Sequence, residues 1–101
     1  MADTLKQTVV VTHNPAASRF EAQVTGQLAV AEYSLAPGTV TFTHTRVPEQ
    51  LAGRGIATQL IEAGLAMARD RGLKVVPHCT FVAAYMKKHP DVQDLLANTG
   101  R

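Results

Sequence analysis

The order of the elements is set by residues 39–61, which read TVTFTHTRVPEQLAGRGIATQLI. Threonine and valine occupy every second position from Thr39 to Val47, and this period of two in β-branched residues predicts a strand. Further along, apolar residues recur at helical spacing and form one stripe, made of Ile56, Leu60, Ile61, Gly64, Leu65 and Ala68. Gly72 is the residue type that closes a helix in the left-handed conformation, so the helix is predicted to end at Arg71.

Three more strands are predicted before this stretch, over Thr8–His13, Arg19–Val24 and Gln27–Ala36. The second of them alternates polar with apolar residues, which is the pattern of a half-buried strand. The strands are separated by turn-forming pairs at Asn14-Pro15, Thr25-Gly26 and Pro37-Gly38. Four consecutive strands joined by short turns predict an antiparallel meander.

The last third of the chain is predicted to return to the sheet and then to a second helix. Lys74–Pro77 is a short apolar strand, and strand, helix, strand across residues 39–77 predicts a right-handed parallel crossover. The second helix is predicted over Thr80–Lys88, ending at His89 because Pro90 disfavours helical geometry in the residue before it. Its expected buried face comprises Phe81, Ala84, Tyr85 and the stem of Lys88. We leave Asp91–Leu96 without a class. The predicted fold class is α/β, with a mixed, mainly antiparallel sheet in the order β-β-β-β-α-β-α.

Length and composition narrow the classes of function. The 101 residues predict a single domain over 1–101. A formal net charge of only +2, with no basic run, argues against a nucleic-acid partner. With Cys79 as its one cysteine, the chain cannot form an internal disulfide or a four-cysteine zinc site, and no histidine–carboxylate spacing suggests a metal. One cysteine, no apolar leader and no membrane-length apolar stretch predict a cytoplasmic protein without a membrane partner.

A glycine-rich turn precedes the first predicted helix. Gly53 and Gly55 carry no side chains, so the unpaired N–H groups of the first helical turn can approach an anion closely. The positive end of the helix dipole makes this position suited to phosphate, with Arg54 as an added cation and the Thr58 hydroxyl as an added donor. The alternative is a plain entry into the helix. A P-loop is excluded because Ala57-Thr58 stands where Lys-Ser/Thr is needed, and the third glycine of a dinucleotide fingerprint is absent.

Two segments together resemble a known family. HTRVPEQLAGRGIA over residues 44–57 is similar to the acyl-CoA motif of the GNAT N-acetyltransferase superfamily, and PHCTFVAAYMKKHP over residues 77–90 resembles its smallest stand-alone members. In the superfamily pattern, Gln or Arg is followed by two residues, Gly, any residue, and then Gly or Ala. Gly55-Ile56-Ala57 matches the latter part, but Ala52 stands where Gln or Arg is usual. The segments occur in the right order and cover most of residues 40–96.

The resemblance implies a cofactor, acetyl-CoA or coenzyme A. The pyrophosphate would lie on the turn, and the residues expected to bind it are Gly53, Arg54, Gly55, Ile56, Ala57 and Thr58. The pantetheine arm would pair with backbone around Thr45 to Val47, in a wedge between the strands on either side of the first helix. Tyr85 and Lys88 are expected near the cofactor from the second helix. The superfamily's helices between its first two strands have no room here, so the acceptor, an amine or a protein, stays undefined. We expect a monomer or weak homo-oligomer.

Cys79 and His44 are the candidate catalytic residues. Cys79 stands between a strand and a helix N-terminus, where a thiolate is favoured, and in the small branch a cysteine here is proposed to take part in acyl transfer. The alternative is a small buried hydrophobe. His44 is predicted to share a face with Val40 and Phe42, near Cys79, with a structural core histidine as the alternative. Glu49 and Glu32 are weaker candidate bases.

Three functions remain open on the sequence. The first is acyl-CoA-dependent transfer of an acetyl group to an amine, either directly or through transient acetylation of Cys79. The second is a non-catalytic CoA-binding or thiol module in which Cys79 forms a mixed disulfide with CoA. The third is a helper subunit whose partner supplies the acceptor site.

Overall fold

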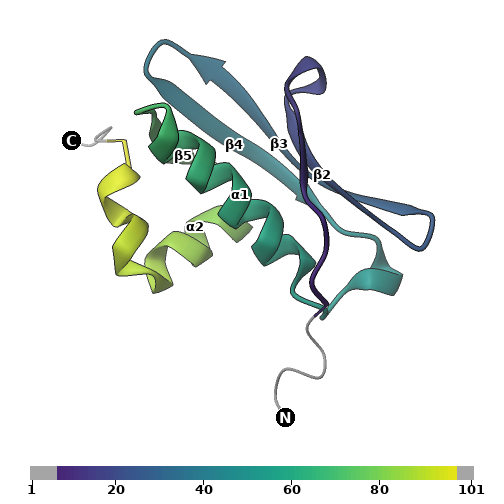
Figure 1. Cartoon of the computed structure of the whole chain (residues 1–101). Helices are drawn as coiled ribbons and strands as arrows, with labels where there is room; N and C mark the ends of the chain where they lie inside the picture. Colours follow the sequence, from purple (N-terminus) through teal and green to yellow (C-terminus); the bar gives the residue numbers. More distant parts are fainter. Residues whose placement is uncertain (1–6, 98–101) are drawn as a thin grey trace.

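The structure, a computed structural model that describes residues 7–97, is a five-stranded sheet with two α-helices packed against it (Figure 1). The strands are β1 (Thr12–Asn14), β2 (Arg19–Val24), β3 (Gln27–Ala36), β4 (Thr39–Arg46) and β5 (Lys74–Pro77). The helices are α1 (Ile56–Asp70) and α2 (Thr80–Lys88), and short 3₁₀ turns occupy Pro15–Ala17, Glu49–Leu51 and Pro90–Leu95. The sheet order is β1-β2-β3-β4-β5, antiparallel throughout except for the parallel pair β4–β5. The predicted fold class and the parallel crossover are confirmed.

The first strand is shorter than predicted. Only Thr12–Asn14 pairs with β2, whereas residues 7–11 run beside the start of α1. There the backbone N–H of Val9 donates to Oε1 of Gln59 at 3.0 Å, and Nε2 of Gln59 donates to the carbonyl of Gln7 at 2.6 Å. The prediction of a strand from Thr8 was wrong because the glutamine side chain satisfies backbone groups that a sheet partner would otherwise bind.

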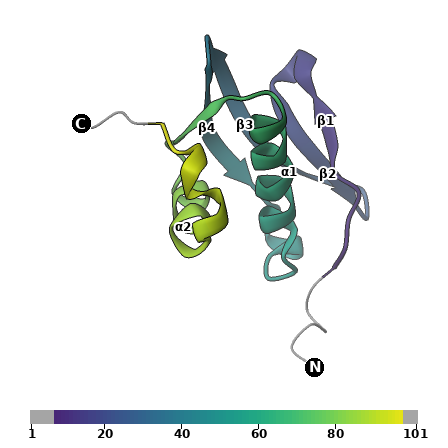
Figure 2. The same cartoon turned by 60° about the vertical axis from the view of Figure 1, so that its left-hand side comes forward.

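One apolar core lies between the sheet and the helices. Figure 1 shows α1 lying along a face of the sheet, and the turned view in Figure 2 places α2 beside α1. The whole predicted stripe of α1 is buried, together with Met67. Gly64 lies where α1 is in tight contact with the sheet, since a Cβ on it would lie 2.6 Å from Cε1 and 2.8 Å from Cζ of Phe42. The close approach of α1 therefore depends on the absence of a side chain at this position.

A bulge in β4 changes which residues face the core. Glu32 pairs with His44 and Tyr33 with Phe42, so Thr43 is an extra residue without a partner across β3. An extra residue shifts the alternation of side chains by one. Phe42 is buried, but His44 has 62% of its side chain exposed on the opposite face. The prediction that His44 shares a face with Phe42 was therefore wrong, because period-two counting assumes an unbroken ladder.

The second helix has the predicted bounds but a different buried face. It ends before His89, as Pro90 predicted. Val82 and Met86 are the buried side chains, whereas Phe81 is 56% exposed. Tyr85 is only half-buried, and Ala84 and Lys88 are exposed. The prediction of Phe81 as core was wrong because apolar residues occur on two sides of this short helix, and their spacing does not say which side meets the sheet.

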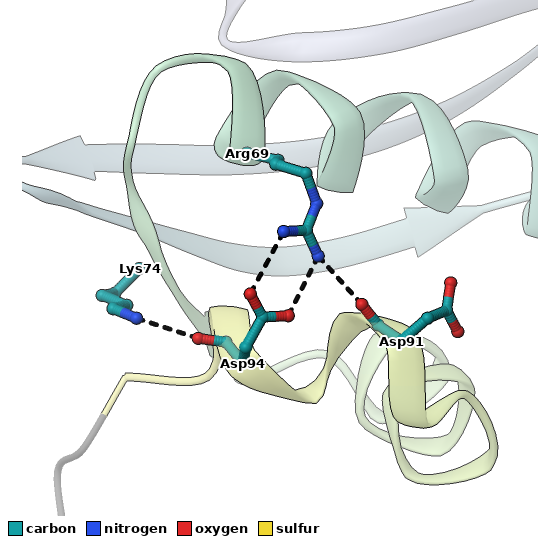
Figure 3. A network of polar contacts seen from close by, with 4 residues as sticks. All are labelled: Arg69, Lys74, Asp91 and Asp94. Carbon is teal, nitrogen blue, oxygen red and sulfur yellow. Dashed lines mark hydrogen bonds and ion pairs between the residues drawn. The ribbon is translucent and has the colours of Figure 1, made fainter.

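The segment after α2 is fixed by an ion network (Figure 3). The Arg69 guanidinium donates to both carboxylate oxygens of Asp94, at 3.1 and 2.9 Å, and to the carbonyl of Asp91 at 2.9 Å. Nζ of Lys74 donates to the Asp94 carbonyl at 2.8 Å. The stretch that the sequence left unclassified is thus a 3₁₀ helix, Pro90–Leu95, tied to the end of α1 and the start of β5.

Candidate functional site

The parallel strands β4 and β5 separate halfway along their length. Thr39–Phe42 of β4 pairs with Lys74–Pro77 of β5. Just after β5, the N–H of Cys79 donates to the carbonyl of Phe42 at 2.8 Å, and this is the last backbone bond to β4 on this side. The chain then turns into α2, while β4 continues to Arg46. Within residues 7–97, the backbone of β4 beyond Phe42 has no strand partner on this side. The predicted wedge is present.

A cavity of about 660 Å³ occupies the wedge. Seven predicted cofactor residues line it, namely Thr45, Val47, Gly53, Gly55, Ile56, Ala57 and Thr58. Six further lining residues were not predicted as site residues, namely Leu28, Arg46, Pro48, Leu51, Ala52 and Phe81. Two of these, Leu28 at 41% and Phe81 at 56%, are among the exposed large apolar side chains. Neither carries a sequence signal for the site, since each also fits the apolar pattern of its strand or helix.

The start of α1 forms one end of the cavity. Gly55 is the N-cap residue with φ 76°, and Gly53 has φ 81°, both in the left-handed region that favours glycine. No side chain caps the helix, and its first turn holds no acidic residue. The N–H groups of this turn therefore keep their capacity to bind an anion, and the helix dipole favours negative charge here.

Arg54 does not line this cavity. Its Nη1 donates to Oε1 of Gln7 at 3.0 Å, and its carbonyl accepts from the Gln7 N–H at 2.9 Å. The guanidinium is thus turned toward the N-terminal segment rather than into the cavity. A role in phosphate binding stays a prediction, and it would use the remaining guanidinium donors.

Cys79 lies where the wedge closes, since its N–H makes the last backbone bond to β4, and it is not among the residues that line the cavity. It is the N-cap residue of α2, only 7% exposed, and its Sγ is 3.3 Å from Oγ1 of Thr45. Thr45 also lines the cavity, so the thiol sits directly behind a lining residue. The prediction that Cys79 stands at a helix N-terminus is confirmed. Its part in chemistry stays a prediction.

His44 is not brought together with Cys79. The imidazole lies on the face of the sheet away from the helices, where Nδ1 is 3.7 Å from Oε1 of Glu32. Glu32 is also 3.9 Å from Nη2 of Arg46. The two candidate catalytic residues therefore stand on opposite faces of β4, and His44 is placed poorly as a base for the Cys79 thiol.

A second groove continues from the wedge between the two helices. It has a volume of about 390 Å³, shares Thr58 and Phe81 with the first cavity, and is also lined by Tyr85 and Lys88. The Tyr85 ring stacks on His89 with centroids 3.8 Å apart. Burial, together with a 3.1 Å hydrogen bond to Oε2 of Glu62, raises the pKa of Tyr85 to about 12. The hydroxyl is thus protonated and engaged with α1.

Two other kinds of site find no support within residues 7–97. No group of three or more histidine, cysteine or acidic side chains there could hold a metal ion. Neither helix in that range has the length and apolarity needed to cross a membrane.

The chain is a small α/β domain whose mixed sheet opens beside an uncapped helix N-terminus. Its fold matches the solution structure of a GCN5-like putative N-acetyltransferase from Staphylococcus aureus, with a TM-score of 0.72, 22% identity and 92% of both chains covered. A family described as GCN5-related N-acetyl-transferase matches residues 19–95, and the chain belongs to this family. The resemblance seen in the sequence is confirmed.

The curated relatives share part of the chain. Protein NATD1 of Xenopus tropicalis is 36% identical over 52 residues, which are 52% of this chain and 48% of that protein. Protein NATD1 of Homo sapiens is 37% identical over 51 residues, 50% of this chain and 45% of that protein. The match thus spans about half the length of these relatives. The family model thus shows the family of this chain, and the solution structure shows its fold.

Proposed function

We propose that the protein transfers an acetyl group from acetyl-CoA to an amine. The observation that carries the proposal is a single cavity with both anion-binding N–H groups and a free strand edge beside Cys79. Family membership supports the same class of activity. No phosphate-binding nucleotide motif competes for this turn.

Each part of acyl-CoA has a matching feature in the chain. The first turn of α1 would bind the pyrophosphate through N–H groups, with the Thr58 hydroxyl alongside. The unpaired backbone of β4 around Thr45 and Val47 would pair with the amides of the pantetheine arm, as an added strand would. The groove between the helices, lined by Tyr85 and Lys88, would take the remaining nucleotide end, where an ammonium group favours phosphate.

The chain's own groups support two routes for the acyl group. In direct transfer, the amine nitrogen forms a bond to the thioester carbon, the carbon–sulfur bond breaks, and the CoA sulfur leaves as thiol. In the second route the Cys79 thiolate attacks first, CoA thiol leaves, and the amine then displaces the Cys79 sulfur. Thr45 would hold the Cys79 thiol through the 3.3 Å contact in either case. The same sulfur position also suits a mixed disulfide with CoA, which keeps the thiol module as the second candidate.

The test compares turnover of acetyl-CoA by the wild type and by Cys79→Ala with a panel of amines. The measured quantity is the rate at which CoA thiol is released. Amine-dependent turnover that Cys79→Ala retains supports direct transfer. Loss in the variant, with an acetyl adduct on the wild type after brief exposure to acetyl-CoA, supports the Cys79 route. If no amine supports turnover and oxidised CoA forms a disulfide with Cys79, the thiol module replaces the enzyme.

A further inference from the structure

The face of the sheet away from the helices carries a cluster of charged side chains beside the wedge. Glu32 of β3 lies across from His44 of β4 in the strand register, and its carboxylate lies within ion-pair distance of both His44 and Arg46. Glu32 is the least exposed of the three, with 29% of its side chain accessible against 62% and 70%. The carboxylate thus stands between two partners that are more exposed than it is.

The wedge cavity reaches this same face. Arg46 lines the cavity, yet it belongs to the face that carries His44, since the two residues are two apart on β4. Leu28 of β3 lies on the same face as Glu32 and also lines the cavity. Phe81 lines the cavity from the helix side. A single cavity is therefore bounded from both faces, around the free edge of β4.

We propose that Glu32 is a positioning residue that orients His44 as the base for the acceptor amine, which approaches from the open face of the sheet. The inference rests on the proposed acetyl transfer. Acyl-CoA would occupy the helix side, so the open face is the side left for the acceptor. The bulge at Thr43 is what places His44 there instead of in the core.

The geometry also favours one tautomer of His44. Its Nδ1 faces the Glu32 carboxylate, so a proton on Nδ1 points toward negative charge and leaves the Nε2 lone pair free. The distance of 3.7 Å is longer than a direct hydrogen bond, and a small rotation of the exposed ring or a bridging water closes it. The other charged groups around this pair on the same face are Arg46 on β4 and Arg19, which lies across from Glu32 on β2. Arg19 is itself paired with Glu21 of the same strand.

The proton transfers balance with the reaction. An acceptor ammonium gives one proton to Nε2 of His44 and becomes the neutral amine that attacks the thioester carbon. When the carbon–sulfur bond breaks, the nitrogen loses its second proton and the CoA sulfur gains one. His44 then returns its proton to solvent. An amine that is already neutral at the assay pH does not need the first step.

The first test reads the tautomer by nitrogen NMR of the His44 ring and needs no turnover. The wild type is expected to carry the neutral-ring proton mainly on Nδ1, and Glu32→Gln is expected to shift it toward Nε2. The matched control is Glu21→Gln, on the same face but bonded to Arg19 and Asn14. Equal tautomer populations in the wild type and Glu32→Gln would overturn the positioning role.

The second test compares acceptors. With an alkylamine, which is charged at neutral pH, His44→Ala is expected to lose about 10²-fold or more in kcat/KM. Glu32→Gln is expected to lose about two- to fivefold, the scale of a partly exposed ion pair. With methoxyamine, which is neutral at that pH, both losses should nearly vanish, and added imidazole should restore His44→Ala with the alkylamine. Equal losses with both acceptors would show a structural role. If none of the amines supports turnover, acetyl transfer is refuted. The role of His44 as a base is then refuted as well, whichever tautomer its ring carries.

Discussion

The replacement of Gly55 by aspartate tests the anion site at the start of α1. Gly55 is the N-cap residue with φ 76°, and the N–H groups behind it are uncapped. A carboxylate at this position would stand about 4 Å from a bound phosphate, where two unit charges repel by about 4 kcal/mol at an intermediate effective dielectric. That corresponds to a loss of roughly 10³-fold in affinity for CoA.

The assay is thermal unfolding with and without CoA. At a concentration of about 100 times Kd, CoA stabilises the wild type by about 2.7 kcal/mol. In a chain of this length that raises the Tm by about 11–22 °C. In Gly55→Asp the same CoA concentration falls below Kd, and the shift should drop to about 1 °C or less.

Two controls separate charge from backbone strain. Gly55→Asn carries the same strain without the charge, so it should lower the Tm of the free protein yet keep most of the CoA shift. Gly38→Asp places a carboxylate at another left-handed glycine, φ 73° with open space around its Cβ, in the turn between β3 and β4, and should respond to CoA like the wild type. Equal CoA shifts in Gly55→Asp and the wild type would refute the anion site.

Substitutions at Gly64, Tyr85 and Arg69 test the packing and the polar contacts, with Phe42→Leu as a second-site change. Gly64→Ala should lower the free energy of unfolding in urea by about 1 kcal/mol, because the clash with Phe42 outweighs the gain in helix propensity. In a protein that already carries Phe42→Leu, Gly64→Ala should no longer cause this loss. Tyr85→Phe should cost about 1 kcal/mol of stability and leave kcat within about twofold, since the hydroxyl serves α1; a large fall in kcat would make Tyr85 a general acid. The hydrogen bond from Arg69 lowers the pKa of Asp94, so that pair stabilises the fold above the ordinary aspartate pKa and less as the pH falls through the lowered value. Arg69→Gln should therefore lower the Tm between about pH 5 and 8. The difference from the wild type should shrink as the pH falls through the lowered pKa of Asp94, leaving only the loss of the bond to the Asp91 carbonyl, whereas a constant difference would show that the ion pair contributes nothing.

The parts of the fold that sequence reasoning captured depend on local patterns. The α1 stripe, its closure at Gly72 and the end of α2 before Pro90 follow from propensity and backbone geometry within a few residues. The glycine turn was found for the same reason, since left-handed conformation and an open helix start are properties of the segment itself.

The parts that sequence reasoning missed depend on contacts between distant segments. The bulge at Thr43 arises from pairing with β3, and one extra residue was enough to move His44 to the other face. Phe81 could not be placed because the face of α2 that meets the core is chosen by the docking of the helix. Arg54 turns toward Gln7, 47 residues away, a partner that no local pattern indicates.

The short strand β5 bears on how the molecule avoids joining other copies of itself. It forms the outer rim of the sheet, where unpaired backbone groups would offer a template to any extended chain. Its outward carbonyl at Val75 is occupied by the N–H of Ala97 at 2.9 Å, and Pro77, two residues on, has no N–H to offer. One occupied carbonyl and one missing N–H thus leave this edge with few groups for pairing with another strand. A chain cut before Leu96 would leave the Val75 carbonyl without this partner and open the rim to pairing with another extended chain.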